Sequence, residues 1–222
     1  MILSQAHAPR EIEFFFDLSS PFAYMAFQEI GVLAARHDRG VRYRAIDLAT
    51  AKKAAGNTGP SNREIPPKFA YLRQDLTRWA QRYGVPFAFP DPAKAPARPR
   101  DAVLAHHGVA FAEEHGMARS FVAAFWRRSW GEGRFVGDPE VLRGAVEEVG
   151  LPEQAFFDYV GSERAAAEFA ASTEEACSRG VFGVPTMMCD GQMWWGNDRL
   201  QMLEEHLSGR SANDATCRAD GQ

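Results

Sequence analysis

The N-terminal part of the chain contains a strand, a helix and a second strand in immediate succession. EIEFFFD, residues 11–17, has the length and aromatic content of a buried strand. Apolar residues recur at helical spacing over residues 21–37, and VRYRAIDL, residues 41–48, alternates apolar and polar side chains. Such a unit crosses over with a right hand and pairs its strands in parallel. The sequence therefore predicts an α/β protein.

A long helical segment follows this unit. The stretch from residue 51 to 100 is rich in proline and in loop signals such as GNTGPSNR. Apolar periodicity between residues 51 and 179 predicts five helices, at residues 68–83, 101–115, 119–130, 139–149 and 152–178, the last with a break near Gly161.

The last third returns to strands. Two short apolar runs, residues 186–189 and 192–195, flank Asp190-Gly191, which is a strong hairpin signal. Asn197 and Asp198 are then expected to cap a helix over residues 199–207. We expect one α/β domain, residues 11–50 and 180–208, interrupted by an all-helical insertion at residues 51–179 and followed by a flexible tail at residues 209–222.

Composition narrows the class of partner. With 222 residues, 45% of them hydrophobic, the chain can bury one core plus an insertion. Its 25 basic and 29 acidic side chains give a net charge of -4, which argues against nucleic acid as the main partner. The N-terminus lacks the pattern of a secretory signal, and the chain lacks an apolar run long enough to span a bilayer, so we expect a cytoplasmic protein without a membrane partner. Three widely spaced cysteines fit neither a disulfide framework nor a zinc site.

Two serines lie where the first strand turns into the first helix. Ser20 precedes Pro21 and is suited to cap the helix, and Ser19 would serve if the boundary shifted by one residue. The other interpretation is a ligand site, because this helix end faces the crevice where open α/β sheets bind ligands and favours an anion. A hydroxyl here lacks a neighbouring base and is therefore suited to donate a hydrogen bond, not to attack.

A ligand thiolate is the anion that fits. A hydrogen bond to a charged acceptor contributes roughly 1.5–3 kcal/mol, and the helix terminus adds roughly 0.3–1 kcal/mol. Since one pKa unit corresponds to about 1.36 kcal/mol, the pKa of a thiol near about 8.5 would fall by roughly one to three units.

VFGVPT, residues 181–186, forms the other half of the expected crevice. Pro185 is either an ordinary turn or edge residue, or part of a cis peptide that leaves the backbone of Val184 available to an extended ligand. Asp198 either caps its helix or binds a ligand ammonium. Asn57 lies in a turn-rich loop, and Lys68 and Tyr71 share one face of their helix, as solvated residues commonly do.

Histidine and tryptophan residues suggest further sites, which we weigh against simpler interpretations. His106 and His107 point apart on a helix and lack an acidic or histidine partner four residues on, so we expect a solvated helix and no metal. Trp126, Trp130, Trp194 and Trp195 either stack on an aromatic ligand or belong to the core.

Five segments together resemble one protein family. FDLSSPFAY, AIDLATAKKAAGNTGPSNR, YLRQDLTRWAQRYGVP, VFGVPTM and MWWGNDRLQMLE resemble, in this order, the bacterial 2-hydroxychromene-2-carboxylate isomerases of naphthalene catabolism. These enzymes belong with the kappa-class glutathione transferases to the disulfide-oxidoreductase A branch of the thioredoxin fold. The resemblance spans about residues 11 to 208. It implies a thioredoxin-like domain with a helical insertion, usually as a homodimer, with glutathione in the crevice.

The resemblance also implies residue roles. The catalytic serine of the family falls on Ser20. The residues that would bind glutathione are Asn57, Lys68, Tyr71, Val184, Pro185, Asn197, Asp198 and Arg199. Where redox relatives carry Cys-x-x-Cys, this chain has none, which removes dithiol exchange as a function.

The implied reaction interconverts 2-hydroxychromene-2-carboxylate and trans-o-hydroxybenzylidenepyruvate. A thiolate adds reversibly to the conjugated carbon, the bond rotates, and glutathione leaves unchanged. Lys68, Arg199 and Lys52 are candidates to bind the substrate carboxylate. The alternatives are a kappa-type transferase or peroxidase that acts on another electrophile, and a non-catalytic glutathione-binding module.

Overall fold

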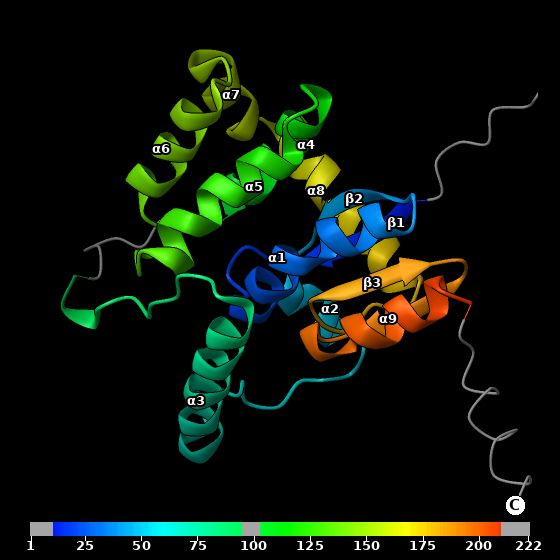
Figure 1. Ribbon diagram of the computed structural model, residues 1–222. Coiled ribbons are helices and arrows are strands. Elements are labelled where there is room, and N and C mark those ends of the chain that lie inside the picture. The colour runs from blue at the N-terminus through cyan, green and yellow to red at the C-terminus, as the bar shows by residue number, and fades with distance from the viewer. Residues whose placement is uncertain (1–10, 95–102, 210–222) are drawn as a thin grey trace, which may run out of the picture.

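The computed structural model describes residues 11–94 and 103–209, and it has the predicted thioredoxin-like architecture (Figure 1). The predicted flexible tail lies outside the described residues beyond Gly209. Among the described helices, none has the length and apolar character that crossing a bilayer requires.

Four strands form one mixed sheet in the order β2-β1-β3-β4. β1 (Glu11–Phe16) pairs in parallel with β2 (Gly40–Ala45), as the strand–helix–strand pattern predicts. β3 (Thr186–Cys189) runs antiparallel to β1, and β4 (Gln192–Trp195) completes the predicted hairpin. β1 therefore lies in the interior of the sheet, and its carboxyl end opens directly into the loop that carries the two serines.

The continuous aromatic run of β1 reflects burial on both faces of the sheet. Phe14 and Phe16 belong to the larger core cluster, and Phe15 between them belongs to a smaller cluster on the opposite face. All three side chains are fully buried. Because successive strand side chains alternate in direction, a run without polar residues indicates a strand covered on both sides.

The helix α1 (Pro21–Arg36) covers one face of the sheet and packs against α3 (Pro66–Tyr83), which extends away from the sheet in Figure 1. α2 (Leu48–Ala54) packs against the long helix α8 (Glu163–Ser178), which also contacts β2. A short 3-10 turn, η1, spans Pro92–Lys94.

The remaining helices of the insertion gather at one end of the molecule (Figure 1). They are α4 (Val103–Glu114), α5 (Ala118–Trp126) with the π-helical turn η2 (Arg127–Gly131), α6 (Pro139–Val149) and α7 (Glu153–Val160). The predicted break near Gly161 is confirmed, because α7 ends there and α8 begins two residues later. The chain closes with the 3-10 turn η3 (Asn197–Arg199) and α9 (Leu200–Leu207).

Three local features differ from what the sequence predicts. Leu48 does not end the second strand but begins α2, because the carboxylate of Asp47 accepts a hydrogen bond from the Ala49 amide at 2.9 Å and so caps a new helix. The helix expected over residues 119–130 widens into a π-helical turn at Arg127. Asn197 and Asp198 do not cap α9, since neither η3 nor α9 has a side-chain cap at its first residue.

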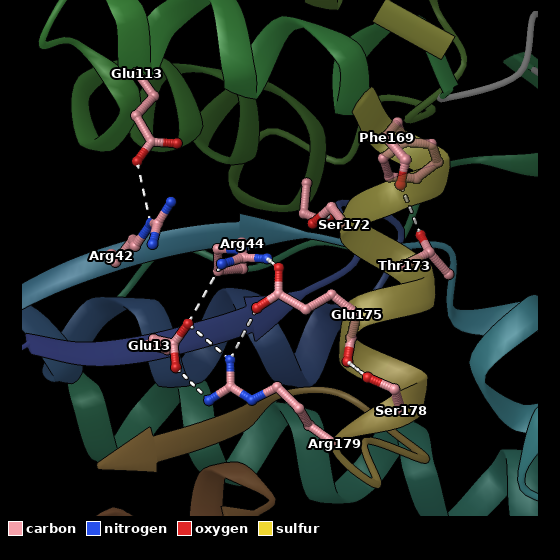
Figure 2. A network of polar contacts seen from close by, with 11 residues as sticks. Glu13, Arg42, Arg44, Glu113, Phe169, Ser172, Thr173, Glu175, Ser178 and Arg179 are labelled. Carbon is pink, nitrogen blue, oxygen red and sulfur yellow. Dashed lines mark hydrogen bonds and ion pairs between the residues drawn. The ribbon is translucent and has the colours of Figure 1, made fainter. Parts of the chain in front are cut away.

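An ionic network joins the sheet to the insertion on the face of β1 and β2 that α8 covers. Figure 2 shows Glu13 of β1 between Arg44 of β2 and Arg179, which follows α8, with Glu175 of α8 completing the network. Both guanidinium groups also lie over the ring of Phe15. The network therefore fixes α8, and with it the start of the segment that leads to Pro185, against the sheet.

Candidate functional site

Ser20 caps α1, so the first of the two cap assignments is confirmed. Its backbone is extended, with φ -90° and ψ 111°, and its Oγ accepts a hydrogen bond from the Ala23 amide at 3.3 Å. The side chain is buried, and Pro21 occupies the first helical position. Because the hydroxyl oxygen acts as the acceptor of the cap, the single hydroxyl proton of Ser20 stays available for donation to a ligand.

Ser19 has the opposite hydrogen-bonding arrangement. Its Oγ donates to Oδ1 of Asp17 at 2.6 Å, and its backbone amide donates to the same oxygen at 2.8 Å. Burial disfavours ionisation of Asp17, but the adjacent His106 and the two bonds from Ser19 outweigh burial and hold the pKa of Asp17 well below its usual range. A carboxylate only accepts hydrogen bonds, so the proton of Ser19 is committed and its oxygen is left as an acceptor.

The helical insertion holds the serine loop from behind through three side chains. The Leu18 amide donates to Nε2 of His106 at 2.9 Å, and the same ring nitrogen lies 3.1 Å from Oδ1 of Asp17. The Leu18 carbonyl accepts from the indole N–H groups of Trp126 at 2.9 Å and Trp130 at 3.2 Å. Both backbone polar groups of Leu18 are thus fixed by the insertion.

The expectation that His106 and His107 lie on a solvated helix face is wrong. Both side chains are buried, because α4 packs against α7, α8 and β2. Nδ1 of His107 lies 2.8 Å from the Val160 carbonyl. Within residues 11–94 and 103–209, no group of three or more metal-binding side chains comes together.

An apolar cavity of about 490 Å³ lies beside the serine loop. Ser19 and Pro21 line one side of it, and Arg63 and Arg73 place two guanidinium groups at it. The Arg63 guanidinium donates to the Ser19 carbonyl at 3.4 Å. The remaining wall is mostly apolar, formed among others by Phe69, Leu72, Phe89, Trp130, Phe135 and Val136. The cavity thus offers apolar walls for a ring and positive charge for an anion.

Two further cavities continue from it along α3. One of about 520 Å³ shares Leu72 with the first cavity and contains Lys68 and Tyr71. The next, of about 420 Å³, shares Phe22, Tyr71 and Asp75 with the second. The three cavities thus lie in series along α3, separated by shared side chains, and we call them together the α3 groove. Ser20 itself lines none of these cavities, but its neighbours Ser19 and Pro21 line the first and Phe22 lines the other two.

Most of the residues predicted to bind glutathione line the α3 groove. Its far cavity is formed in part by Tyr71, Val184, Pro185, Asn197, Asp198 and Arg199. The peptide bond between Val184 and Pro185 is cis, so the second of the two interpretations of Pro185 is confirmed for the backbone conformation. Trp195 is half-exposed at the same place and packs over Gly183, where an added Cβ would lie 2.4 Å from the indole nitrogen.

Two predicted residues lie elsewhere. Asn57 is exposed and lines none of the described cavities, whereas Asn62 of the same loop lines the cavity of Lys68. Lys52 also lines none of them. Trp126 and Trp194 pack into the core, so the simpler interpretation of these two tryptophans is confirmed, while Trp130 is both buried and part of the apolar cavity.

Sequence reasoning missed the two arginines and Asp17. Arg63 and Arg73 lie five residues before and after Lys68, but only the folded chain brings both to the serine loop. Asp17 follows directly after the buried strand, and a carboxylate two residues before a serine is a known turn-forming pattern, so a signal for it was present.

Comparisons with known proteins identify the family of the chain. Residues 11–208 match the DSBA-like thioredoxin domain. The 2-hydroxychromene-2-carboxylate isomerase of Sphingobium xenophagum is 42% identical over 198 residues, which cover 89% of this chain and 98% of that protein. A solved structure of a 2-hydroxychromene-2-carboxylate isomerase superposes with a TM-score of 0.82 and 37% identity, over 93% of this chain and 98% of the other.

A more distant relative carries the name of a different enzyme. The human glutathione S-transferase kappa 1 is 24% identical over 210 residues, which cover 90% of this chain and 92% of that protein. The chain belongs to the DSBA-like thioredoxin family and, within it, to the family of the 2-hydroxychromene-2-carboxylate isomerases.

Proposed function

We propose that this protein is a glutathione-dependent isomerase that interconverts 2-hydroxychromene-2-carboxylate and trans-o-hydroxybenzylidenepyruvate. The observation that carries the proposal is the arrangement around Ser20. At the amino end of α1 its Oγ accepts the cap bond, and none of the hydrogen bonds of the described residues uses its proton, while its neighbours Ser19 and Pro21 line the apolar, arginine-bearing cavity and Phe22 lines the rest of the α3 groove. The identity to the isomerases over most of both chains supports the same conclusion.

The residues of the α3 groove fit glutathione. Asp198 offers a carboxylate to the γ-glutamyl ammonium, and the Val184 backbone beside cis-Pro185 suits the cysteinyl backbone. Nδ2 of Asn197 is buried without a hydrogen-bond partner of good geometry among the described residues, which a polar ligand would supply. In this proposal the groove residues that hold the tripeptide are Lys68, Tyr71, Val184, Pro185, Asn197, Asp198 and Arg199. Asn57, which lines none of the cavities, would contact the tripeptide only from outside the groove.

Glutathione, when bound, would supply a thiolate: once the hemiketal ring has opened to the α-keto acid, with the ring oxygen released as a phenol, the thiolate can add reversibly to the conjugated C=C bond and so permit rotation. The part of Ser20 is to donate its hydroxyl proton as a hydrogen bond to that sulfur. A charge-assisted bond contributes roughly 1.5–3 kcal/mol, and the amino end of α1 favours the same negative charge. Ser20 does not act as a nucleophile in this account, because none of the hydrogen bonds of the described residues joins its hydroxyl to a base that could take its proton.

The 490 Å³ cavity is where the proposal places the aromatic substrate. Trp130 and Phe89 provide ring surfaces, and the guanidinium of Arg63 lies next to the serine loop, where it can pair with the substrate carboxylate. Arg63 thus takes the role for which Lys68, Arg199 and Lys52 were the candidates. A bidentate guanidinium suits a planar carboxylate better than a lysine ammonium does.

An absorbance assay tests the function directly. Purified protein is mixed with 2-hydroxychromene-2-carboxylate, with and without glutathione, while the amount of free thiol is followed in parallel. We expect isomerisation that requires glutathione and consumes none of it. Full turnover without glutathione would contradict the proposal, and loss of thiol with formation of a conjugate would indicate a kappa-type transferase instead.

The proposal extends to the setting of the enzyme. We infer a cytoplasmic homodimer that serves the breakdown of naphthalene-type aromatic compounds, as the resemblance of its motifs implies. Light scattering on the full chain measures the oligomeric state. We expect the mass of a dimer, and the mass of a monomer would contradict the proposed homodimer.

A further inference from the structure

We propose that Ser19 is a substrate-specificity residue whose Oγ accepts a hydrogen bond from the hydroxyl group of 2-hydroxychromene-2-carboxylate. This inference rests on the proposed function and extends it, because it assigns to the neighbouring serine a part that differs from that of Ser20. It concerns the substrate, not glutathione, and it starts from the direction of one hydrogen bond.

The oxygen of the Ser19 hydroxyl is fixed as a hydrogen-bond acceptor. Its hydroxyl proton lies on the 2.6 Å bond to Oδ1 of Asp17, and a buried carboxylate cannot return a proton to it. Asp17 itself is held in place by the Ser19 amide, by the Leu48 amide at 3.2 Å and by His106 at 3.1 Å. Rotation of the Ser19 hydroxyl to donate elsewhere would therefore break a charge-assisted hydrogen bond.

The carboxylate of Asp17 makes the Ser19 hydroxyl oxygen a stronger acceptor. In a chain in which a ligand hydroxyl donates to a serine hydroxyl that in turn donates to a carboxylate, each bond polarises the next. Ser19 is half-buried and lines the 490 Å³ cavity, whose apolar walls reduce competition from water. A ligand hydroxyl placed here would find in Ser19 Oγ an acceptor for its proton, and not a competing donor.

Arg63 places a positive charge at the same loop. Its guanidinium donates to the Ser19 backbone carbonyl at 3.4 Å, and both residues line the cavity, so a carboxylate-binding group is anchored to the same residue that carries the hydroxyl acceptor. In 2-hydroxychromene-2-carboxylate the hydroxyl and the carboxylate are attached to the same carbon. The pair Arg63 and Ser19 thus matches the two substituents of that carbon, one as a cation and the other as an acceptor.

The two serines therefore divide the hydrogen-bonding work. Ser20 accepts from the Ala23 amide and donates its proton forward, which suits an anionic sulfur. Ser19 donates its proton backward and accepts from in front, which suits a ligand hydroxyl and repels an anion. This opposite polarity follows from hydrogen-bond partners and not from the identity of the residues.

The test uses two ligands that cannot react, because they lack both the conjugated bond and the ring oxygen. These are 2-hydroxytetralin-2-carboxylate and tetralin-2-carboxylate, which differ only in the hydroxyl group. Their dissociation constants are measured by calorimetry for the wild-type protein, for Ser19→Ala and for the control Ser178→Ala, whose hydroxyl bonds to the Glu175 carbonyl far from the cavity. The wild-type protein should prefer the hydroxylated ligand.

We expect Ser19→Ala to bind the hydroxylated ligand roughly tenfold more weakly and the other ligand with unchanged affinity. Equal losses for both ligands would show that Ser19 only supports the loop, and unchanged affinities would show that it makes no ligand contact, so either result overturns the inference. Ser178→Ala should change neither affinity. Binding is measured without turnover, so the two claims can fail separately. A wild-type protein that isomerises but does not prefer the hydroxylated ligand refutes this inference alone. Absent isomerisation refutes the proposed function.

Discussion

His106 of α4 lies 3.1 Å from the carboxylate of Asp17, the residue that directly follows β1. This contact joins the helical insertion to the loop that presents both serines. Together with the bond from the Leu18 amide to the same ring, it makes the insertion part of the framework that holds this loop. The thioredoxin-like sheet supplies the loop, and the insertion fixes its shape.

The first prediction concerns Ser20. We expect Ser20→Ala to retain the fold and glutathione binding while isomerisation falls roughly ten- to a hundredfold, because one charge-assisted hydrogen bond is lost. Loss of the helix cap should also lower the free energy of unfolding by about 0.5–2 kcal/mol. Steady-state kinetics and denaturant unfolding measure the two effects.

Ser162→Ala is a matched control for that variant. Ser162 caps α8, and its Oγ accepts from the Ala165 amide at 3.2 Å, as Ser20 does in α1. Because its hydroxyl also donates to the Tyr159 carbonyl at 2.6 Å, we expect a loss of stability at least as large, with unchanged turnover. Equal turnover in the two variants would mean that Ser20 acts only as a cap.

The second prediction concerns His106. We expect His106→Leu to lower the free energy of unfolding by about 1–3 kcal/mol, because it leaves the buried Leu18 amide without its acceptor and removes the polar ring beside Asp17, and to lower turnover by loosening the loop. A glutamine side chain can both accept and donate, so His106→Gln should restore much of each loss. Unfolding and steady-state kinetics are measured side by side.

His107→Leu supplies the comparison. This neighbouring ring bonds to the Val160 carbonyl within the insertion and not to the serine loop. Stability should fall while the kinetics of the folded protein stay unchanged. If both histidine variants reduce turnover alike, the link through Asp17 has no special part.

The third prediction concerns pH and the network of Figure 2. Hydrogen bonding to Arg179 lowers the pKa of Glu13, and hydrogen bonding to Arg44 lowers the pKa of Glu175, although burial opposes both shifts. A carboxyl group whose pKa is lower in the folded chain stabilises the fold above its unfolded pKa, about 4.3, and that contribution disappears as the pH falls through the folded value.

We therefore expect Glu13→Gln to lower the free energy of unfolding at pH 7 by roughly 0.5–1 kcal/mol, a difference that shrinks steadily in acid. Urea unfolding across the acid range measures this. Glu147→Gln, at an exposed position of α6, is the control and should show little change at any pH. If the free energy of unfolding of Glu13→Gln lay below that of the wild-type protein by the same amount at every pH, the loss would come from packing and not from charge.

The fourth prediction concerns Arg63. Arg63→Gln should raise KM for the chromene carboxylate roughly tenfold, because it removes the cation next to Ser19, while the affinity for glutathione stays unchanged. Arg78→Gln, on the exposed side of α3, controls for the loss of one positive charge. An equal rise of KM in both variants would point to general electrostatic attraction.

Most of the fold could be predicted from local patterns. The buried strand of residues 11–16, the capped helix after it and the Asp190-Gly191 hairpin each carry a signal within a few residues. The start of α2 was missed because alternating residues up to Leu48 mimic a strand, although Asp47 carries a cap signal. The π-helical turn at Arg127 has no comparable local signal.

The candidate site divides in the same way. Ser20, Val184 and Asp198 follow from motifs, because each occupies a fixed place in the thioredoxin-like framework. The roles of Arg63 and His106 depend on packing between segments far apart in the chain, which no local pattern encodes. The opposite polarity of the two serines depends on such a contact as well, through Asp17.

The most direct test of the account is the pKa of the glutathione thiol while it is bound, read from the ultraviolet absorption of the thiolate as pH is raised. Free thiols of this kind titrate near about 8.5, and the wild-type protein should lower the pKa of the bound thiol by roughly one to three units. The shift should largely disappear in Ser20→Ala and persist in Ser162→Ala. A bound thiol that titrates at its free value in the wild-type protein would contradict the central claim that Ser20 stabilises a thiolate.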